Sequence, residues 1–299
     1  MIIQAIIRAI RLLQRRDLIM KHFFRACAAL LLLCLPAMSL AATEPNTKVI
    51  EETTSYEDET IRIIIDRWCY AFNNTELRFF VANVYTQRPD QLLTAFAGEE
   101  YSTENAEATS AIAERHDAVI AINGDYYNYR DKNGLVIRNG VLYRDAPSTR
   151  DQLLVMADGT FVALPRGTYE EGTGQDYLDQ GVVQSFTFGP LLVNEGQAVE
   201  LPSDYIINTR DTVREPRTAI GQVDANHYVL LVADGRREDW SDRGMTLQEM
   251  QKVFVEQGCS VAYNLDGGGS ATMVLNGERV NKTSGSRERN VSDIIYFVK

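Results

Sequence analysis

The chain has 299 residues, in which 41 Asp+Glu outnumber 30 Lys+Arg and give a formal net charge of −11 at pH 7. A protein this acidic repels the phosphate backbone of nucleic acids, so its composition argues against nucleic-acid binding. Any anionic ligand would need a local cationic pocket. The length is sufficient for one large domain with a hydrophobic core.

The N-terminal segment 1–41 has the pattern of an export signal. A basic stretch ending at Arg25 leads into the apolar run 26–35, which is shorter than the roughly 20 residues that span a bilayer. Small residues then mark a cleavage site near Ala41 or Ala42. We therefore expect a periplasmic or extracellular protein that meets the membrane only through this signal; an uncleaved N-terminal anchor is the alternative.

After removal of this segment, 24 Lys+Arg face 40 Asp+Glu, a net charge of −16. Two cysteines, Cys69 and Cys259, remain in the mature chain. In an oxidising compartment they could form one disulfide, and two buried thiols are the equally compatible alternative.

The first half of the mature chain alternates polar and β-rich segments. Residues 42–59 are polar and acidic and predict a flexible lead-in to a domain over 60–299. The β-branched and aromatic segments 61–65 and 77–85 predict an antiparallel pair. A helix over 103–115, capped at Ser102 or Thr103, and a buried strand over 118–122 follow.

Turn dipeptides organise the middle of the chain. Asn139-Gly140 and Asp158-Gly159 each join two short apolar segments and predict hairpins. The polar stretch 166–180 predicts a surface loop. Further strands are expected at 182–188, 218–223, 227–233, 261–265, 271–275 and 294–298.

A helix is expected after Thr246, because Thr246 and Glu249 have the spacing of a capping box and apolar residues recur at helical spacing up to Phe254. Strands outnumber helices without a regular alternation of the two. The sequence therefore predicts an α+β fold, with a mixed, largely antiparallel sheet and a few flanking helices in a single globular domain.

The segment Asn264 to Ser270 is the strongest functional signal. A buried strand leads into Asp266 and then into Gly267, Gly268 and Gly269. Three glycines allow close approach to the backbone, and their N–H groups together with that of Ser270 could bind an anion. Asp266 could act as acid, base, nucleophile or cation ligand. A turn-capping aspartate is the structural alternative.

A second segment has the same design, since the strand 118–122 leads into Asn123-Gly124-Asp125. If the two strands were parallel neighbours, their turns would emerge at one sheet edge and Asp125 would share a cleft with Asp266. An ordinary tight turn is the alternative.

Two arginines could supply the cation for an anionic ligand. Arg217 stands at the entry of an apolar strand and Arg289 precedes the final strand. A guanidinium can hold a phosphate through two hydrogen bonds. The structural alternative for both is an ordinary ion-paired surface side chain. Asp234, at a strand end, could add a carboxylate or form a turn.

In combination, these motifs resemble the phosphodiester glycosidase family. The resemblance rests on ordered segments over roughly residues 115–299: 121–127, 217–221, 234–236 with 244–247, 264–273, and 288–289 with 291–292. Asp125 stands where the family more often has glycine, which weakens its catalytic assignment; Asn290 stands where the family often has proline.

The resemblance implies hydrolysis of a sugar-1-phosphodiester at the C1–O bond. Asp266 would act at the anomeric carbon, and Arg217 with Arg289 would hold the phosphate. Predicted substrate contacts come from Asn123, Gly124, Tyr126, Thr218, Asp234, Gly267, Gly268, Gly269 and Ser270. The sequence requires no cofactor, and a bound Ca²⁺ or Mg²⁺ is compatible with it. The expected partner is a phosphorylated or phosphodiester-linked carbohydrate.

Two other functions remain compatible with these residues. A non-catalytic glycan-binding module of the cell envelope would keep the glycines and aromatic residues. A phosphodiesterase cleaving the P–O bond would place Asp125, Asp234 and Asp266 around Ca²⁺ or Mg²⁺.

Overall fold

A computed structural model describes residues 47–72, 75–126, 133–202, 213–236 and 243–299. The predicted export signal, with its cleavage near Ala41 or Ala42, lies outside these residues. The described residues from Thr47 onward belong to one compact unit. None of their helices is long and apolar enough to cross a membrane.

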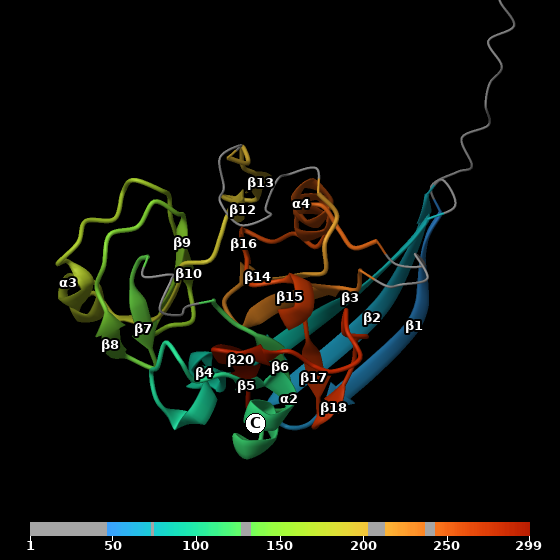
Figure 1. The fold of residues 1–299 in the computed structure, drawn as a ribbon, viewed down its shortest axis with the longest axis horizontal. Coiled ribbons are helices and arrows are strands. Elements are labelled where there is room, and N and C mark those ends of the chain that lie inside the picture. Colours follow the sequence, from blue (N-terminus) through green and yellow to red (C-terminus); the bar gives the residue numbers. More distant parts are fainter. Residues whose placement is uncertain (1–46, 73–74, 127–132, 203–212, 237–242) are drawn as a thin grey trace, which may run out of the picture. The chain divides into compact units, whose positions relative to one another are not determined.

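Two antiparallel sheets form the body of the protein (Figure 1). The larger has eight strands, in the order β1 (Thr47–Glu57), β2 (Ile61–Phe72), β3 (Thr75–Thr86), β15 (His227–Ala233), β14 (Arg217–Asp224), β16 (Val261–Asn264), β12 (Leu191–Asn194) and β13 (Gln197–Ala198). The second has five, in the order β18 (Glu278–Arg279), β17 (Met273–Leu275), β6 (Ile120–Asn123), β20 (Asp293–Phe297) and β4 (Leu92–Phe96).

Smaller elements complete the unit. Three further sheets are β10 (Phe161–Leu164), β9 (Gln152–Met156) and β11 (Val182–Phe186); β7 (Val136–Arg138) and β8 (Val141–Arg144); and β5 (Glu107–Ala108) and β19 (Asn290–Val291). The helices are α2 (Thr109–Arg115), α3 (Gly174–Asp179) and α4 (Leu247–Glu256), with short 3₁₀ helices at Pro89–Gln91, Ala97–Glu99 and Gly268–Ser270.

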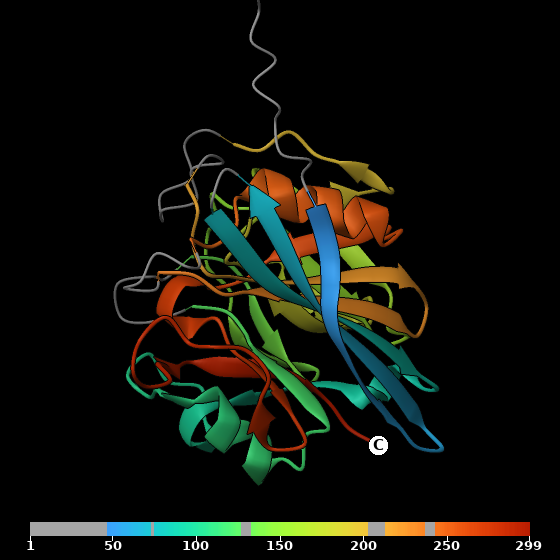
Figure 2. The same cartoon turned by 90° about the vertical axis from the view of Figure 1, so that its right-hand side faces the viewer.

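The two large sheets pack face to face, with a helix on each outer side (Figure 2). Strand β3 shows why both faces of the larger sheet are covered, because its apolar side chains alternate between the two faces. Phe80 and Ala82 join the core between the sheets, whereas Phe79 and Val81 pack with α4. Helix α2 covers the outer face of the five-stranded sheet. The central strands are buried on both faces, which explains their nearly continuous apolar sequences.

Several expected elements are confirmed. Strands β2 and β3 form the predicted antiparallel pair, and Asn139-Gly140 and Asp158-Gly159 join the predicted hairpins. Helix α4 begins with the predicted capping box between Thr246 and Glu249. Local turn and cap chemistry was sufficient to locate these elements.

The expectation of a mixed sheet is wrong for the described strands, because every pairing among them is antiparallel. In particular, β6 and β16 are not parallel neighbours, since they belong to different sheets. The prediction had relied on their similar sequences, which do not encode their strand partners.

The flexible lead-in expected over 42–59 is wrong from Thr47 onward, where β1 pairs with β2 along its length. Two of its acidic side chains are paired across the strands, because Arg67 forms ion pairs with Glu51 and Glu52. A strand at the edge of a sheet tolerates a polar sequence because one side faces water.

The helix expected over 103–115 begins only at Thr109. Its predicted caps at Ser102 and Thr103 are wrong, because Glu288 supplies the cap from a distant segment by accepting hydrogen bonds from the Ser110 amide and hydroxyl. The loop expected over 166–180 contains the short helix α3.

The two cysteines are not bonded to each other. Cys69 and Cys259 are both buried without a disulfide. Burial raises the pKa of the Cys259 thiol to about 12. This settles the alternative in favour of two buried thiols.

Candidate active site

Asp266 lies just beyond β16, where the chain leaves the protein interior. All four residues of β16 are buried, whereas Asp266 keeps partial exposure. Its Oδ1 accepts a hydrogen bond from the Gly267 amide at 2.9 Å, and the Ser270 side chain also hydrogen-bonds to the carboxylate. Burial raises the pKa of Asp266 to about 6, although Ser270 and Arg289 oppose the shift. A carboxyl group that titrates near neutral pH is typical of active sites.

The glycines after Asp266 allow two other segments to touch the turn. A Cβ at Gly267 would lie 2.6 Å from the Pro216 carbonyl oxygen, and one at Gly269 would lie 3.0 Å from Cδ of Arg289. Gly268 has a positive φ of 61°, which glycine adopts without strain. The three glycines therefore serve close packing around the carboxylate.

Most of the N–H groups that were predicted to bind an anion already donate to acceptors within the protein. The amide of Gly267 donates to the Asp266 side chain, that of Gly268 to the Pro216 carbonyl at 2.8 Å, and that of Ser270 to the Gly267 carbonyl at 3.1 Å. These bonds hold the turn in its own conformation, so an anion bound here must be held mainly by side chains.

Arg217 lies against the turn through its backbone, because a Cβ at Gly267 would be 3.4 Å from Cα of Arg217. It is only 4% exposed, and its Nε and Nη2 donate to the carbonyl oxygens of Met245 and Val213 at 3.1 and 2.9 Å. Burial lowers the pKa of Arg217 to about 10, which leaves it charged at neutral pH. The predicted bidentate phosphate clamp does not fit, because two of its nitrogens already bind carbonyls. The Arg217 guanidinium is instead a buried charge close to those of Glu215 and Arg236.

Two exposed arginines lie over the glycines. The nearest guanidinium nitrogen of Arg236 is 3.3 Å from the position of a Cβ at Gly268, while Arg289 packs over Gly269. Arg236 also forms an ion pair with Glu215, which raises its pKa. Sequence reasoning missed Arg236, although it named the motif 234–236 and selected only the carboxylate. The Arg-Gly contact that reveals Arg236 joins segments far apart in the chain.

The turn after β6 meets the Asp266 turn even though their strands belong to different sheets. Asn123 is fully buried; its Nδ2 donates to the Asp266 carbonyl at 2.6 Å, and its Oδ1 accepts from the Thr218 hydroxyl at 2.7 Å and the Thr272 amide at 3.2 Å. Thr218 is also fully buried. Their burial and internal hydrogen bonds favour a bracing role beneath the Asp266 backbone, and direct contacts of Asn123 and Thr218 with a sugar remain predictions.

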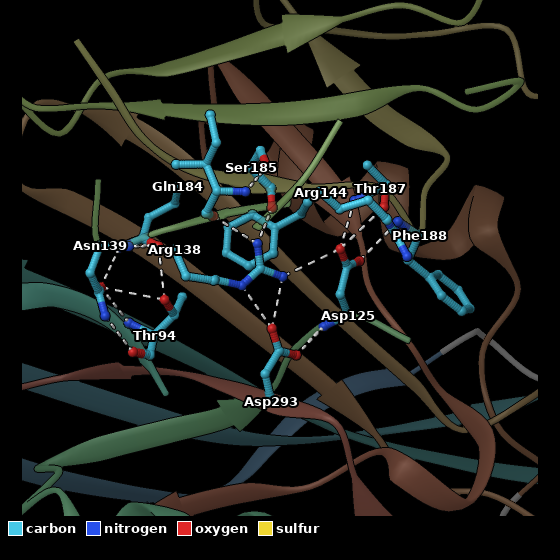
Figure 3. Close-up of polar contacts among 12 residues, drawn as sticks. Thr94, Asp125, Arg138, Asn139, Arg144, Gln184, Ser185, Thr187, Phe188 and Asp293 are labelled. Atoms are coloured by element: carbon cyan, nitrogen blue, oxygen red, sulfur yellow. Dashed lines mark hydrogen bonds and ion pairs between the residues drawn. The ribbon is translucent and has the colours of Figure 1, made fainter. Parts of the chain in front are cut away.

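Asp125 is buried in a separate polar network (Figure 3). Its two oxygens accept hydrogen bonds from the amides of Thr187 and Phe188 at 2.8 and 2.9 Å, and Oδ2 lies 3.5 Å from Nη2 of Arg138. The neighbouring Gly124 packs so tightly that a Cβ there would lie 2.4 Å from Asp293 Oδ1. These contacts favour a structural role for Asp125, and neither residue is open to a substrate.

Of the two remaining predicted residues, Asp234 is buried and Tyr126 is partly exposed. Asp234 is 2% exposed and accepts hydrogen bonds from the Asn281 side chain and the Lys282 amide, so it anchors the chain after β17. Tyr126 keeps partial exposure next to Asp125, and its contact with a sugar remains a prediction.

Within the described segments, no three His, Cys, Asp or Glu side chains come together as a group that could hold a metal ion. Asp125, Asp234 and Asp266 therefore do not form the cation site that a P–O-cleaving phosphodiesterase was expected to use. Asp266 feels the charge of Arg289, which lowers its pKa, and the like charge of Asp125, which raises it. The exposed arginines over the turn suit an anionic ligand.

The family model for phosphodiester glycosidases matches residues 116–298. This chain belongs to the phosphodiester glycosidase family. The match covers the segments that carried the resemblance in the sequence, including both turns and all three arginines.

Individual relatives agree with this assignment. An uncharacterized SPβ prophage-derived protein of Bacillus subtilis, YomE, is 30% identical over 202 residues, 65% of this chain and 30% of its own. The mouse N-acetylglucosamine-1-phosphodiester alpha-N-acetylglucosaminidase is 33% identical over 175 residues, 53% of this chain and 32% of its own. This chain thus spans about a third of the length of these relatives.

Solved structures show the same fold. The catalytic domain of the zebrafish N-acetylglucosamine-1-phosphodiester alpha-N-acetylglucosaminidase, auto-inhibited by its pro-peptide, matches with a TM-score of 0.67 at 21% identity, over 84% of this chain and 89% of that one. A putative exported protein from Burkholderia pseudomallei matches with a TM-score of 0.51 at 16% identity, over 75% of this chain and 74% of that one.

Proposed function

We propose that this protein is an exported hydrolase that cleaves the C1–O bond of a sugar-1-phosphodiester, releasing a free sugar and a phosphomonoester, in the metabolism of envelope or exopolysaccharide glycans. Membership of the phosphodiester glycosidase family supports the reaction class. The basic and apolar pattern before Ala42 supports export.

One observation carries the assignment to this site: the partly exposed carboxylate of Asp266, with a pKa of about 6, lies in a turn covered by Arg236 and Arg289. The chain as a whole is strongly acidic, with a formal net charge of −11. The arginines supply the local positive charge that a phosphodiester needs in order to bind.

The chemistry follows from these charges. Breaking the C1–O bond builds positive charge on the sugar ring, which ionised Asp266 stabilises or attacks. Negative charge grows on the departing phosphate, where Arg236 and Arg289 hold it, and the buried charge of Arg217 lies close to Arg236. Because the phosphate is already a good leaving group, the site needs no strong general acid.

The position of the broken bond tests the proposal. The full chain is incubated with a sugar-1-phosphodiester, in which one phosphate is esterified to C1 of the sugar and to a second alcohol, in ¹⁸O-water, and both products are analysed by mass spectrometry. We expect the label in the sugar for wild type. Label in the phosphate would show P–O cleavage, and binding without turnover would show a glycan-binding module; either result would reject the proposal.

Variants assign the activity to the site. Asp266→Asn should be inactive and Arg217→Ala strongly impaired, while Asp158→Asn and Arg88→Ala, at exposed positions in a hairpin turn and a loop, serve as matched controls. If both site variants hydrolysed the substrate at wild-type rates, the assignment of the reaction to this turn would be rejected.

A further inference from the structure

A buried ionic network lies next to the candidate active site (Figure 3). Asp293 is fully buried. Its Oδ2 accepts hydrogen bonds from two nitrogens of Arg138, Nε at 2.8 Å and Nη2 at 2.7 Å. Arg138 is 2% exposed and also reaches Asp125 at 3.5 Å and the Ser185 carbonyl. Since Arg138 belongs to the hairpin β7–β8, Asp293 to β20 and Ser185 to β11, the network joins three separate sheets.

The network holds the turn after β6 from two sides. The Asp125 amide donates to Asp293 Oδ1 at 2.8 Å, and the Gly124 amide donates to the Asp293 carbonyl at 3.0 Å. On its other side, the Gly124 carbonyl accepts the Asp266 amide at 3.3 Å, and Asn123 donates to the Asp266 carbonyl. Thus a single turn separates the buried ions from the backbone of the candidate catalytic carboxylate.

From this connection we infer that Asp293 and Arg138 are positioning residues for Asp266. They lock the turn 123–125, and the turn fixes the backbone from which the Asp266 carboxylate projects. The inference rests on the proposed function, because it assigns the work at the anomeric carbon to Asp266. A displacement of about 1 Å at such a carboxylate can lower a rate by about 10²-fold.

The ionic composition supports a role beyond packing. Two carboxylates share one guanidinium in a fully buried site, and replacing buried ion pairs by apolar residues is often neutral or stabilising. Directional bonds from Arg138 instead define where Asp293 sits, and Asp293 in turn binds two consecutive amides of the turn.

The test compares Asp293→Asn with Gln184→Met. The first keeps an oxygen for the Asp125 amide but removes the charge that orients Arg138. The control removes another buried set of hydrogen bonds, in which Gln184 of β11 binds Thr94 and Asn139, the latter in the turn of the hairpin β7–β8. None of these bonds touches the turn 123–125. Arg138→Lys, which keeps the positive charge but loses the fork, is the second variant in case Asp293→Asn does not fold.

Two measurements are made at equal folded fraction. We expect kcat of Asp293→Asn to fall about 10- to 100-fold with KM changed less than about threefold, because Arg236 and Arg289 lie outside the network. Hydrogen exchange of the Asp266 amide should accelerate at least about tenfold in this variant and stay near wild type in Gln184→Met. Arg138→Lys should show smaller changes in the same direction.

Equal kcat values in Asp293→Asn and Gln184→Met, or unchanged exchange at Asp266, would overturn the inference. The exchange measurement requires no turnover. If wild type hydrolysed no sugar phosphodiester, the proposed function would fail, while exchange would still decide whether the buried ions hold the Asp266 backbone.

Discussion

Two turns with the same local design have opposite properties in this protein. Each follows a short buried strand and combines polar residues with glycine, one at Asn123 to Asp125 and the other at Asp266 to Ser270. The side chains of the first are buried and bound by main-chain amides, hydroxyls and Arg138. The carboxylate of the second keeps partial exposure and a pKa of about 6. A polar turn thus becomes a brace or a reactive site according to the segments that pack on it.

The largest expected effect is a difference in activity between variants of the two turn carboxylates, Asp266 and Asp125. Asp266→Asn should lower kcat/KM by about 10³-fold or more, because it removes the charge that acts at the anomeric carbon. Asp125→Asn should cost about tenfold or less, since Asp125 only supports the turn. Steady-state kinetics on both variants measures the difference, and similar losses would mean that the two turns share the chemistry.

The arginines over the second turn come next. Arg236→Ala and Arg289→Ala should each lower kcat/KM about 10- to 100-fold, because each removes a charged donor to the phosphate. Arg88→Ala, at an exposed arginine paired with Asp90, should leave the kinetics unchanged. Activity that survives both site substitutions would place the phosphate elsewhere.

Replacing one glycine of each turn by alanine tests how tightly each turn is packed. Gly124→Ala should lower the free energy of unfolding by about 1–3 kcal/mol, because the new methyl group meets the buried Asp293 carboxylate. Gly269→Ala should change it by less than about 0.5 kcal/mol, since exposed Arg289 can move aside, but should reduce activity. Urea unfolding distinguishes the two, and a large loss of stability at Gly269 would show a rigid arginine.

The last expected effect is a pH-dependent stability. Burial raises the folded pKa of Asp266 to about 6, above the 3.8 of a free side chain, so the folded state binds more protons between these values and loses stability as pH rises through them. Asp266→Asn should therefore be about 1–2 kcal/mol more stable than wild type at pH 7, with the difference vanishing near pH 4.

The matched Asp125→Asn variant should be less stable than wild type at pH 7, because Asp125 accepts two main-chain amides and faces Arg138. Urea unfolding at pH 4 and pH 7 measures both variants. In the kinetics, kcat/KM of wild type should fall as pH drops below about 6, since Asp266 must be ionised to act. A rising activity over this range would identify Asp266 as a general acid instead.

Sequence reasoning succeeded where the deciding interaction is local. The capping box at Thr246 and the turn dipeptides at Asn139 and Asp158 depend on residues within a few positions of one another. It failed for α2, whose start is set by Glu288, 178 positions from Ser110. It failed for β1 because the partners of its acidic residues lie on the next strand.

The sequence by itself determined the family, the acidic surface, most strands and the carboxylate in the glycine turn, because motifs and periodic burial are recorded along the chain. Only the tertiary structure buried Asp125 while leaving Asp266 partly exposed, bound the Arg217 guanidinium to the Met245 and Val213 carbonyls, and placed Arg236 over the turn. The physical reason is that exposure, desolvation and charge pairing depend on neighbours brought together from distant segments. Identical residue types therefore acquired different chemistry according to what surrounds them.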